Sequence, residues 1–155
     1  MSRDALHVDS CLACDLAAGR VPLPGGRIHS TGHWIVEHCI GPLPLGTLIV
    51  KPVRHVTCVA ELSDNEVAEL GPLLRLASAV ARELVRADQV YNCLWSHAGG
   101  RPVHVHYVVQ PVTRQDVERL GTYGPSLQVA LFEHGRAPAA TQIEQLAERA
   151  RVLFA

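Results

Sequence analysis

The sequence predicts an α+β fold in which helices pack on an antiparallel β-sheet. Strand-like and helical segments do not alternate regularly along the chain, and short Pro/Gly clusters separate them. Because a doubly wound parallel sheet requires regular alternation, the antiparallel arrangement is favoured. The 155 residues are 48% apolar, which is enough to build one core. We therefore expect residues 1–155 to form a single domain.

The first half of the chain predicts a strand pair followed by a long helix. Residues 33–39 and 47–52 have strand character, and the Pro/Gly-rich segment 41–46 connects them. Ser63 and Glu66 have the spacing of a capping box, and apolar residues then recur at helical spacing. They are Val67, Leu70, Leu74, Ala77, Ala81, Leu84 and Val85. Gly71-Pro72 falls inside this helix, where proline is expected to kink or break it.

The second half predicts two more strands and a closing helix. The strands cover residues 89–96 and 103–112, and residues 97–102 form a loop between them. Residues 113–140 give no clear pattern. Thr141 and Glu144 again have capping-box spacing, so we expect a final helix to begin there. Its apolar side would carry Ile143, Leu146, Ala150 and Leu153.

Composition excludes several classes of partner. The formal net charge is −1 and the basic residues are scattered, which argues against nucleic acid as a partner. No run of eighteen apolar residues occurs, and the first ten residues lack the apolar segment of a signal peptide, so we expect no membrane contact and a cytoplasmic protein. Five cysteines are an odd number, which favours reduced thiols over a disulfide framework.

Residues 103–112 are the most informative segment for function. On a strand, alternate side chains share a face, so His104 and His106 would lie together with Val108 and Gln110. The intervening apolar residues would pack against the helices, and the two histidines would line a site. Two histidines on a half-exposed strand without any function are the alternative, because such alternation also occurs by chance.

The chain is similar here to the histidine triad (HIT) superfamily, whose signature is three histidines at alternate strand positions followed by a proline. The resemblance covers residues 11–112, and it includes the C-x-x-C pair, the segment Lys51-Pro52-Val53-Arg54-His55 and the histidine strand that ends at Pro111. It implies a HIT-like fold, a nucleophilic His106, and a homodimer whose sheet continues across two subunits. Val108 replaces the third histidine. Residues 113–155 lie outside the resemblance as a C-terminal helical extension.

The resemblance also points to residues that would hold a purine nucleotide or nucleotide conjugate. Arg101 stands where the family has polar groups that contact the phosphate, and its guanidinium pairs well with phosphate oxygens. Ser96 lies near the position of a pocket-lining asparagine. Glu37 is the acidic residue nearest to the position that holds the ribose hydroxyls.

Cys11 and Cys14 offer two thiolates from one turn of chain, a pattern that fits a metal site, a redox pair or two buried cysteines. A zinc-carrying branch of the family completes this pair with two histidines, and His55 and His104 stand at the matching places. The resemblance thus implies a structural Zn²⁺ bound by Cys₂His₂, with no open position for a reacting water. Cys39, Cys58 and Cys93 are expected to serve in packing.

Three functions remain open at this stage. The first is an enzyme that attacks the α-phosphate of AMP-like substrates, either nucleoside phosphoramidates or dinucleoside polyphosphates. The second is a nucleotide-binding module with little or no catalysis, because Val108 can neither donate a hydrogen bond nor take a proton. The third is a thiol redox protein. Trp34 and Trp95 could form walls of a purine site, but core packing is the favoured use of large aromatics on strands. His38 and His97 flank segments that would reach the pocket.

Overall fold

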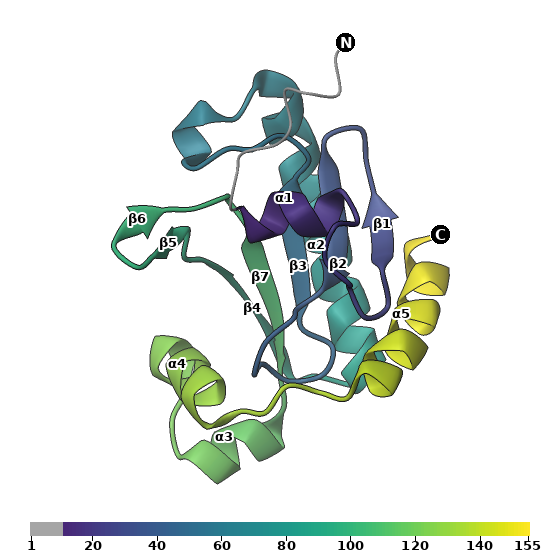
Figure 1. Ribbon diagram of the computed structural model, residues 1–155. Coiled ribbons are helices and arrows are strands. Elements are labelled where there is room, and N and C mark those ends of the chain that lie inside the picture. Colours follow the sequence, from purple (N-terminus) through teal and green to yellow (C-terminus); the bar gives the residue numbers. More distant parts are fainter. Residues whose placement is uncertain (1–10) are drawn as a thin grey trace.

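The computed structural model describes residues 11–155, which form a five-stranded antiparallel sheet with helices on both faces (Figure 1). The α+β prediction is thereby confirmed. The expectations for the first ten residues, including the absence of an apolar leader, lie outside the described part of the chain. In spatial order the strands are β1 (Arg27–Ser30), β2 (Trp34–His38), β3 (Leu48–Pro52), β7 (Tyr107–Val112) and β4 (Gln89–Leu94).

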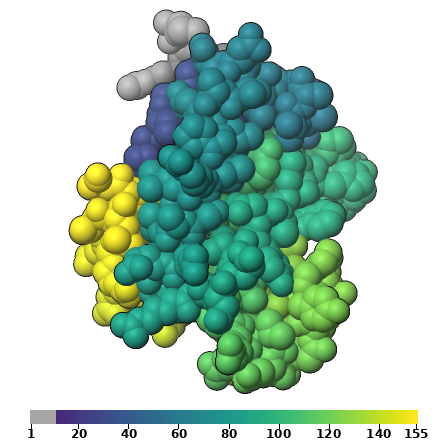
Figure 2. Space-filling model, turned by 180° about the vertical axis from the view of Figure 1, so that it is seen from behind, coloured from purple at the N-terminus to yellow at the C-terminus, as the bar shows by residue number. Residues whose placement is uncertain are grey.

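Helix α2 (Asp64–Val85) covers one face of the sheet, as the view from behind shows (Figure 2). The predicted capping box is present, because the Ser63 side chain accepts from the Glu66 amide and Glu66 accepts from the Ser63 amide. Contrary to expectation, the helix runs through Pro72 without a break. Pro72 and Ala68 both lie on the exposed side, where water can bond the Ala68 carbonyl that Pro72 leaves unpaired.

The main core lies between this helix, the sheet and α5 (Ala140–Phe154). Its strand residues alternate in sequence, as expected for one face of a sheet. Its members include Ile28, Trp34, Val36, Leu48, Val50, Val109, Leu73, Leu84, Leu146 and Phe154. Val67 was expected on the buried side of α2, but it is 55% exposed and lies outside the main core.

The other face of the sheet carries a second cluster and two further helices. Helices α3 (Arg114–Leu120) and α4 (Gly124–His134) occupy the segment that gave no clear pattern in the sequence. Val108 belongs to this cluster together with Leu127 and Leu131 of α4. The short helix α1 (Leu12–Ala17) also lies over this face, nearer to the opposite ends of the strands (Figure 1). A 3₁₀ turn (Val59–Glu61) precedes α2.

The final helix begins earlier than predicted. Its N-cap is Ala139, whose amide donates to the Gln142 side chain at 3.0 Å, and Thr141 lies within the first turn. The Thr141 capping box is therefore wrong. Leu153 is 40% exposed, whereas Phe154 is buried and stacks on His29 with ring centroids 4.8 Å apart.

The histidine segment is only partly a strand. β7 begins at Tyr107, and the Val105 amide donates to the Val56 carbonyl at 2.7 Å instead of joining the sheet. The predicted strand from residue 103 is thus too long at its start. Residues 97–102, expected as a loop, form a small hairpin of β5 (His97–Ala98) and β6 (Arg101–Pro102). Gly99 and Gly100 supply the two positive φ angles of its turn.

No helix within residues 11–155 has both the length and the apolar character needed to cross a membrane.

Candidate functional site

Two cysteines and two histidines from three separate segments converge beside α1. Cys11 caps this helix and Cys14 lies in its first turn, so a spacing of three residues puts both thiols on one side. The Cys14 sulfur lies 3.4 Å from Nδ1 of His55 and 3.5 Å from Nδ1 of His104, and the Cys11 sulfur lies 3.6 Å from the latter atom. All four candidate ligand atoms fall within 4.8 Å of one another.

These distances fit a tetrahedral zinc ion. A sulfur at 2.3 Å and a nitrogen at about 2.0–2.1 Å from such an ion are separated by about 3.5 Å. The His104 Nε2 atom lies 2.9 Å from the Pro52 carbonyl oxygen, which can only accept, so Nε2 carries the hydrogen and Nδ1 keeps a lone pair toward the thiols. Burial lowers the pKa of His104 to about 4, which keeps the imidazole neutral, the form that binds metals.

His55 is presented by the segment that follows β3. Its neighbour Arg54 makes two hydrogen bonds to the Glu66 carboxylate, at 3.2 and 2.9 Å, and one to the Glu61 carbonyl. Arg54 lowers the pKa of Glu66, with smaller contributions from Ser63. The start of α2 therefore anchors the segment that carries His55.

A cavity of about 580 Å³ opens next to this cluster. α1 forms one wall with Leu12, Ala13 and Leu16, and the hairpin forms another with Ala98, Arg101 and Pro102. The strands β2 and β3 provide the floor, and the histidine segment runs along one side. Most of the cavity surface is therefore apolar, with a small number of polar groups, as in typical small-molecule sites.

His106 lines this cavity and is half-buried. Its Nδ1 atom lies 2.8 Å from the His104 carbonyl oxygen. Because a carbonyl only accepts, Nδ1 carries the hydrogen and Nε2 is left with the lone pair. The backbone thus holds both the ring orientation and the tautomer that a nucleophilic imidazole requires.

The other predicted nucleotide contacts divide into two groups. Arg101 and Glu37 both line the cavity, Arg101 from the exposed hairpin and Glu37 from the buried floor. Ser96 does not line it. The Ser96 hydroxyl is buried and has no hydrogen-bond partner among residues 11–155.

Lys51 is a cavity residue that sequence reasoning missed, although it lies in the Lys51-Pro52 segment that supported the resemblance. Its ammonium is 2.5 Å from Glu37 Oε1 and donates to the Ala13 carbonyl at 3.0 Å. A lysine in the middle of a strand predicts a solvated side chain, and only the buried partner Glu37 reveals otherwise.

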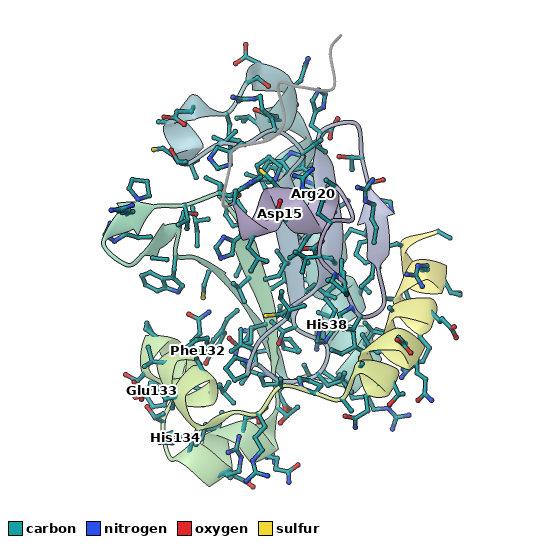
Figure 3. All side chains as sticks on the ribbon, viewed as in Figure 1. Asp15, Arg20, His38, Phe132, Glu133 and His134 are labelled. Atoms are coloured by element: carbon teal, nitrogen blue, oxygen red, sulfur yellow. The ribbon has the colours of Figure 1, made fainter. Side chains whose placement is uncertain are left out.

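His38, which flanks the pocket, has a structural role that explains its burial (Figure 3). Its Nδ1 donates to the Cys39 carbonyl at 2.7 Å, and its Nε2 accepts from the Gly46 amide at 2.9 Å. Burial lowers the pKa of this imidazole. His97, by contrast, is exposed on the hairpin. In α1, Asp15 accepts a hydrogen bond from Arg20 at 2.8 Å (Figure 3).

Two packing predictions need correction. Trp34 is fully buried as expected, but Trp95 is 64% exposed and donates to the Gln128 side chain at 3.0 Å. Cys58 is exposed in the 3₁₀ turn region, because residues 57–61 lie outside the apolar clusters. Cys39 packs against the second cluster, and burial raises the pKa of its thiol to about 11.

Comparison with solved structures relates this architecture to known proteins. A HIT-like protein involved in cell-cycle regulation from Bartonella henselae, with an unknown ligand, is 13% identical, with 95% of this chain and 98% of that chain covered and a TM-score of 0.70. A hypothetical histidine triad nucleotide-binding protein from Sulfolobus tokodaii is 19% identical, with coverages of 92% and 91% and a TM-score of 0.68.

A zinc-bound histidine triad family protein from Mycobacterium smegmatis is also 19% identical, with 94% of this chain and 95% of that chain covered and a TM-score of 0.67. No family profile matches the sequence, and no curated protein matches it. The similarity is therefore one of three-dimensional structure. At sequence identities this low, it establishes the fold alone. This chain has the fold of the histidine triad proteins.

Proposed function

We propose that the chain is a nucleotide-binding enzyme that attacks the α-phosphate of AMP-like substrates, such as nucleoside phosphoramidates or dinucleoside polyphosphates, with Nε2 of His106. The observation that carries this proposal is the hydrogen bond from His106 Nδ1 to the His104 carbonyl, beside a cavity of about 580 Å³. That bond leaves the lone pair on the other ring nitrogen, and the cavity has the volume of a small-molecule site.

The proposed reaction proceeds in two steps. Nε2 of His106 forms a bond to the α-phosphorus while the bond from phosphorus to the leaving group breaks, and the leaving group departs with the electron pair. Water then attacks the same phosphorus, and the phosphorus–Nε2 bond breaks with its electron pair returning to Nε2. The proton that the water loses balances the proton taken up by the leaving group, and the nucleoside monophosphate is released. Arg101 is placed in this proposal at the phosphate, where its guanidinium offsets the negative charge.

Glu37 is proposed to accept hydrogen bonds from the nucleoside part, since it lines the buried floor of the same cavity. Ser96 is proposed as a further nucleotide contact, because its hydroxyl has no hydrogen-bond partner among residues 11–155. It does not line the cavity, so the geometry supports this assignment least.

We further propose a structural Zn²⁺ held by Cys11, Cys14, His55 and His104. Sulfur-to-nitrogen separations of 3.4–3.6 Å support it, as does the zinc in the Mycobacterium smegmatis protein of the same fold. The ion would join α1, the segment after β3 and the histidine segment, and four protein ligands leave no site for a reacting water.

We also propose that the chain forms a homodimer, that it is cytoplasmic and that it has no nucleic-acid partner. β4 is an edge strand of the sheet, so its free edge can pair with a second copy. Light scattering coupled to gel filtration will give the mass in solution. A monomer at micromolar concentration would remove the dimer from the proposal.

A binding module without catalysis is the second candidate, and the burial of Val108 in the cluster under α4 favours it. The experiment that separates the two measures nucleotide release from fluorogenic AMP and GMP amidates by the wild type, His106→Ala and the control His97→Ala. For each compound, we expect His97→Ala to keep the wild-type rate and His106→Ala to lose at least about 1000-fold in rate.

Nucleotide binding measured by calorimetry completes this test. Binding without turnover would assign the chain to the binding module. Turnover that survives in His106→Ala would remove His106 as the nucleophile, and the absence of both binding and turnover would refute the nucleotide proposal as a whole.

A further inference from the structure

A buried ion pair lies on the cavity floor, outside the bond-making steps proposed for His106. Lys51 and Glu37 come from the neighbouring strands β3 and β2, and they are 1% and 3% exposed. Leu12 and Leu16 of α1 and Ile49 of β3 line the cavity beside them. Charged groups in such apolar surroundings are costly unless their hydrogen-bonding capacity is filled.

That capacity is only partly filled. Glu37 Oε1 accepts from Lys51, but no group within residues 11–155 donates to Oε2. Oε2 is also not among the fully buried unpaired atoms of the described chain, so it is open to the cavity that Glu37 lines. Lys51 uses its other contact on the Ala13 carbonyl, which ties the carboxylate to the wall formed by α1. A rigid acceptor therefore faces the ligand space.

The distance from His106 indicates which part of a nucleotide reaches this acceptor. His106 directly precedes β7, and β3 lies between β7 and the strand that carries Glu37. Two strand spacings amount to about 9–10 Å across the sheet, and Glu37 lies level with Val108, two residues beyond His106, which adds about 6–7 Å along the strand direction. A nucleotide whose α-phosphate lies at His106 spans that separation with its base, whereas its sugar hydroxyls lie closer to the phosphate. The base edge is thus the part that meets Glu37.

A carboxylate only accepts hydrogen bonds, so it selects bases that offer donors. Guanine presents a ring N1–H beside an exocyclic N2 amine, so one donor can bond Oε2 while its neighbour bonds the second lone pair of Oε1, which already accepts from Lys51. Adenine presents the N1 lone pair beside a single amine. The amine can donate to the carboxylate, but the N1 lone pair would face a carboxylate oxygen, and two acceptors repel each other. We propose that Glu37, positioned by Lys51, reads the base and makes guanine nucleotides the preferred ligands of this cavity. This inference rests on the proposed nucleotide-binding function.

The test compares the dissociation constants of GMP, IMP and AMP for the wild-type protein as purified, by calorimetry. We expect GMP to bind at least about tenfold more tightly than AMP, because a matched pair of hydrogen bonds to a base gives about that discrimination or more. IMP keeps N1–H and lacks the N2 amine, so it should bind with intermediate affinity. Equal binding of GMP and AMP would overturn the inference without any variant.

Variants assign the preference to the residue. Glu37→Gln replaces one acceptor oxygen by a donor. We expect it to raise the dissociation constant of GMP about tenfold and that of AMP by less than about threefold. Glu83→Gln is the matched control, because Glu83 is exposed on α2 and outside the cavity lining. If Glu37→Gln weakens both nucleotides equally, Glu37 does not read the base. Circular dichroism of each variant reports whether it is folded.

A sugar contact is tested separately with 2′-deoxy-GMP. Binding equal to that of GMP supports recognition of the base, whereas a loss as large as that of Glu37→Gln would move Glu37 to the ribose and overturn the inference. Failure here is distinct from failure of the proposed function. Tight binding of AMP with no preference refutes only the guanine inference, and no binding of any nucleotide refutes both.

Discussion

The backbone carbonyl of His104 accepts a 2.8 Å hydrogen bond from the ring of His106, while the His104 ring itself belongs to the Cys₂His₂ cluster. One residue thus supports the tautomer of the proposed nucleophile with its main chain and the proposed metal with its side chain. The His104 ring is held in turn by the Pro52 carbonyl at 2.9 Å. Disturbance of the cluster is therefore expected to reach His106 across a single residue.

Zinc content is the first prediction that follows. We expect the purified protein to contain one zinc ion per chain, and chelation to lower the Tm by about 10 °C or more, because binding to the folded state alone adds directly to stability. Cys14→Ser should behave like the stripped protein, whereas Cys58→Ser, at an exposed thiol, should keep both zinc and Tm. Metal analysis and calorimetric scans give the answer. Metal-free protein with a Cys11–Cys14 disulfide and an unchanged Tm would support the redox function instead.

Glu66→Gln should destabilise the protein by about 1–2 kcal/mol at pH 7, the usual cost of losing hydrogen bonds to a charged partner. Glutamine preserves the capping box with Ser63, so the loss isolates the contact with Arg54. The folded state lowers the pKa of Glu66, so its contribution is present above the unfolded pKa and disappears as the pH falls through the folded value. In urea unfolding, the difference in stability between the variant and the wild type should therefore begin to narrow below about pH 4, the ordinary pKa of a glutamate, and continue to narrow as the pH falls further.

The exposed residue Glu83 supplies the control for this pH series, because its substitution by glutamine should leave stability within about 0.5 kcal/mol at every pH. A gap for Glu66→Gln that stays constant from pH 7 to pH 3 would mean that the carboxylate charge is not what Arg54 stabilises.

Gly135→Ala should destabilise the protein by about 2–3 kcal/mol through overpacking. A Cβ atom at Gly135 would overlap the carbonyl oxygens of Pro42 and Leu131, and backbone atoms cannot rotate out of the way. Gly71→Ala is a control of opposite sign. Nothing lies within 4 Å of its Cβ position inside α2, so it should stabilise by about 0.5–1 kcal/mol. Chemical denaturation measures both, and a neutral Gly135→Ala would show that the segment after α4 can move away from Pro42.

Restoring a histidine at the third triad position should not restore a third catalytic group. Val108 packs with Leu127 and Leu131, so Val108→His should destabilise by about 1–3 kcal/mol, because it buries a polar ring without a partner. Amidate turnover should stay at or below the wild-type rate. Val152→His, at a position that is 76% exposed, should be neutral. A stable Val108→His variant with faster turnover would place position 108 against the substrate.

Helix α2 and the C-x-x-C pair are features that could be predicted from residues close together in the sequence. The Ser63–Glu66 capping box and the two thiols of α1 involve residues three positions apart, so the chain's own geometry brings them together. The antiparallel sheet was predictable for a similar reason, since strand alternation and Pro/Gly connections are local. Val103 to His106 departed from the pattern because the Val105 amide is bonded to Val56, a partner far away in the sequence.

The sequence by itself determined which side chains are present for the site: two thiols and two imidazoles that can bind a metal, and a further histidine two positions after His104. What only the tertiary structure decided is which of them meet, because Cys14 approaches His55 across 41 residues and His104 across 90. The burial of Lys51 against Glu37 and of Val108 beneath α4 also belongs to the structure. Burial and pairing depend on atoms contributed by distant segments, and the free energy of a charge or a methyl group is set by those neighbours rather than by its place along the chain.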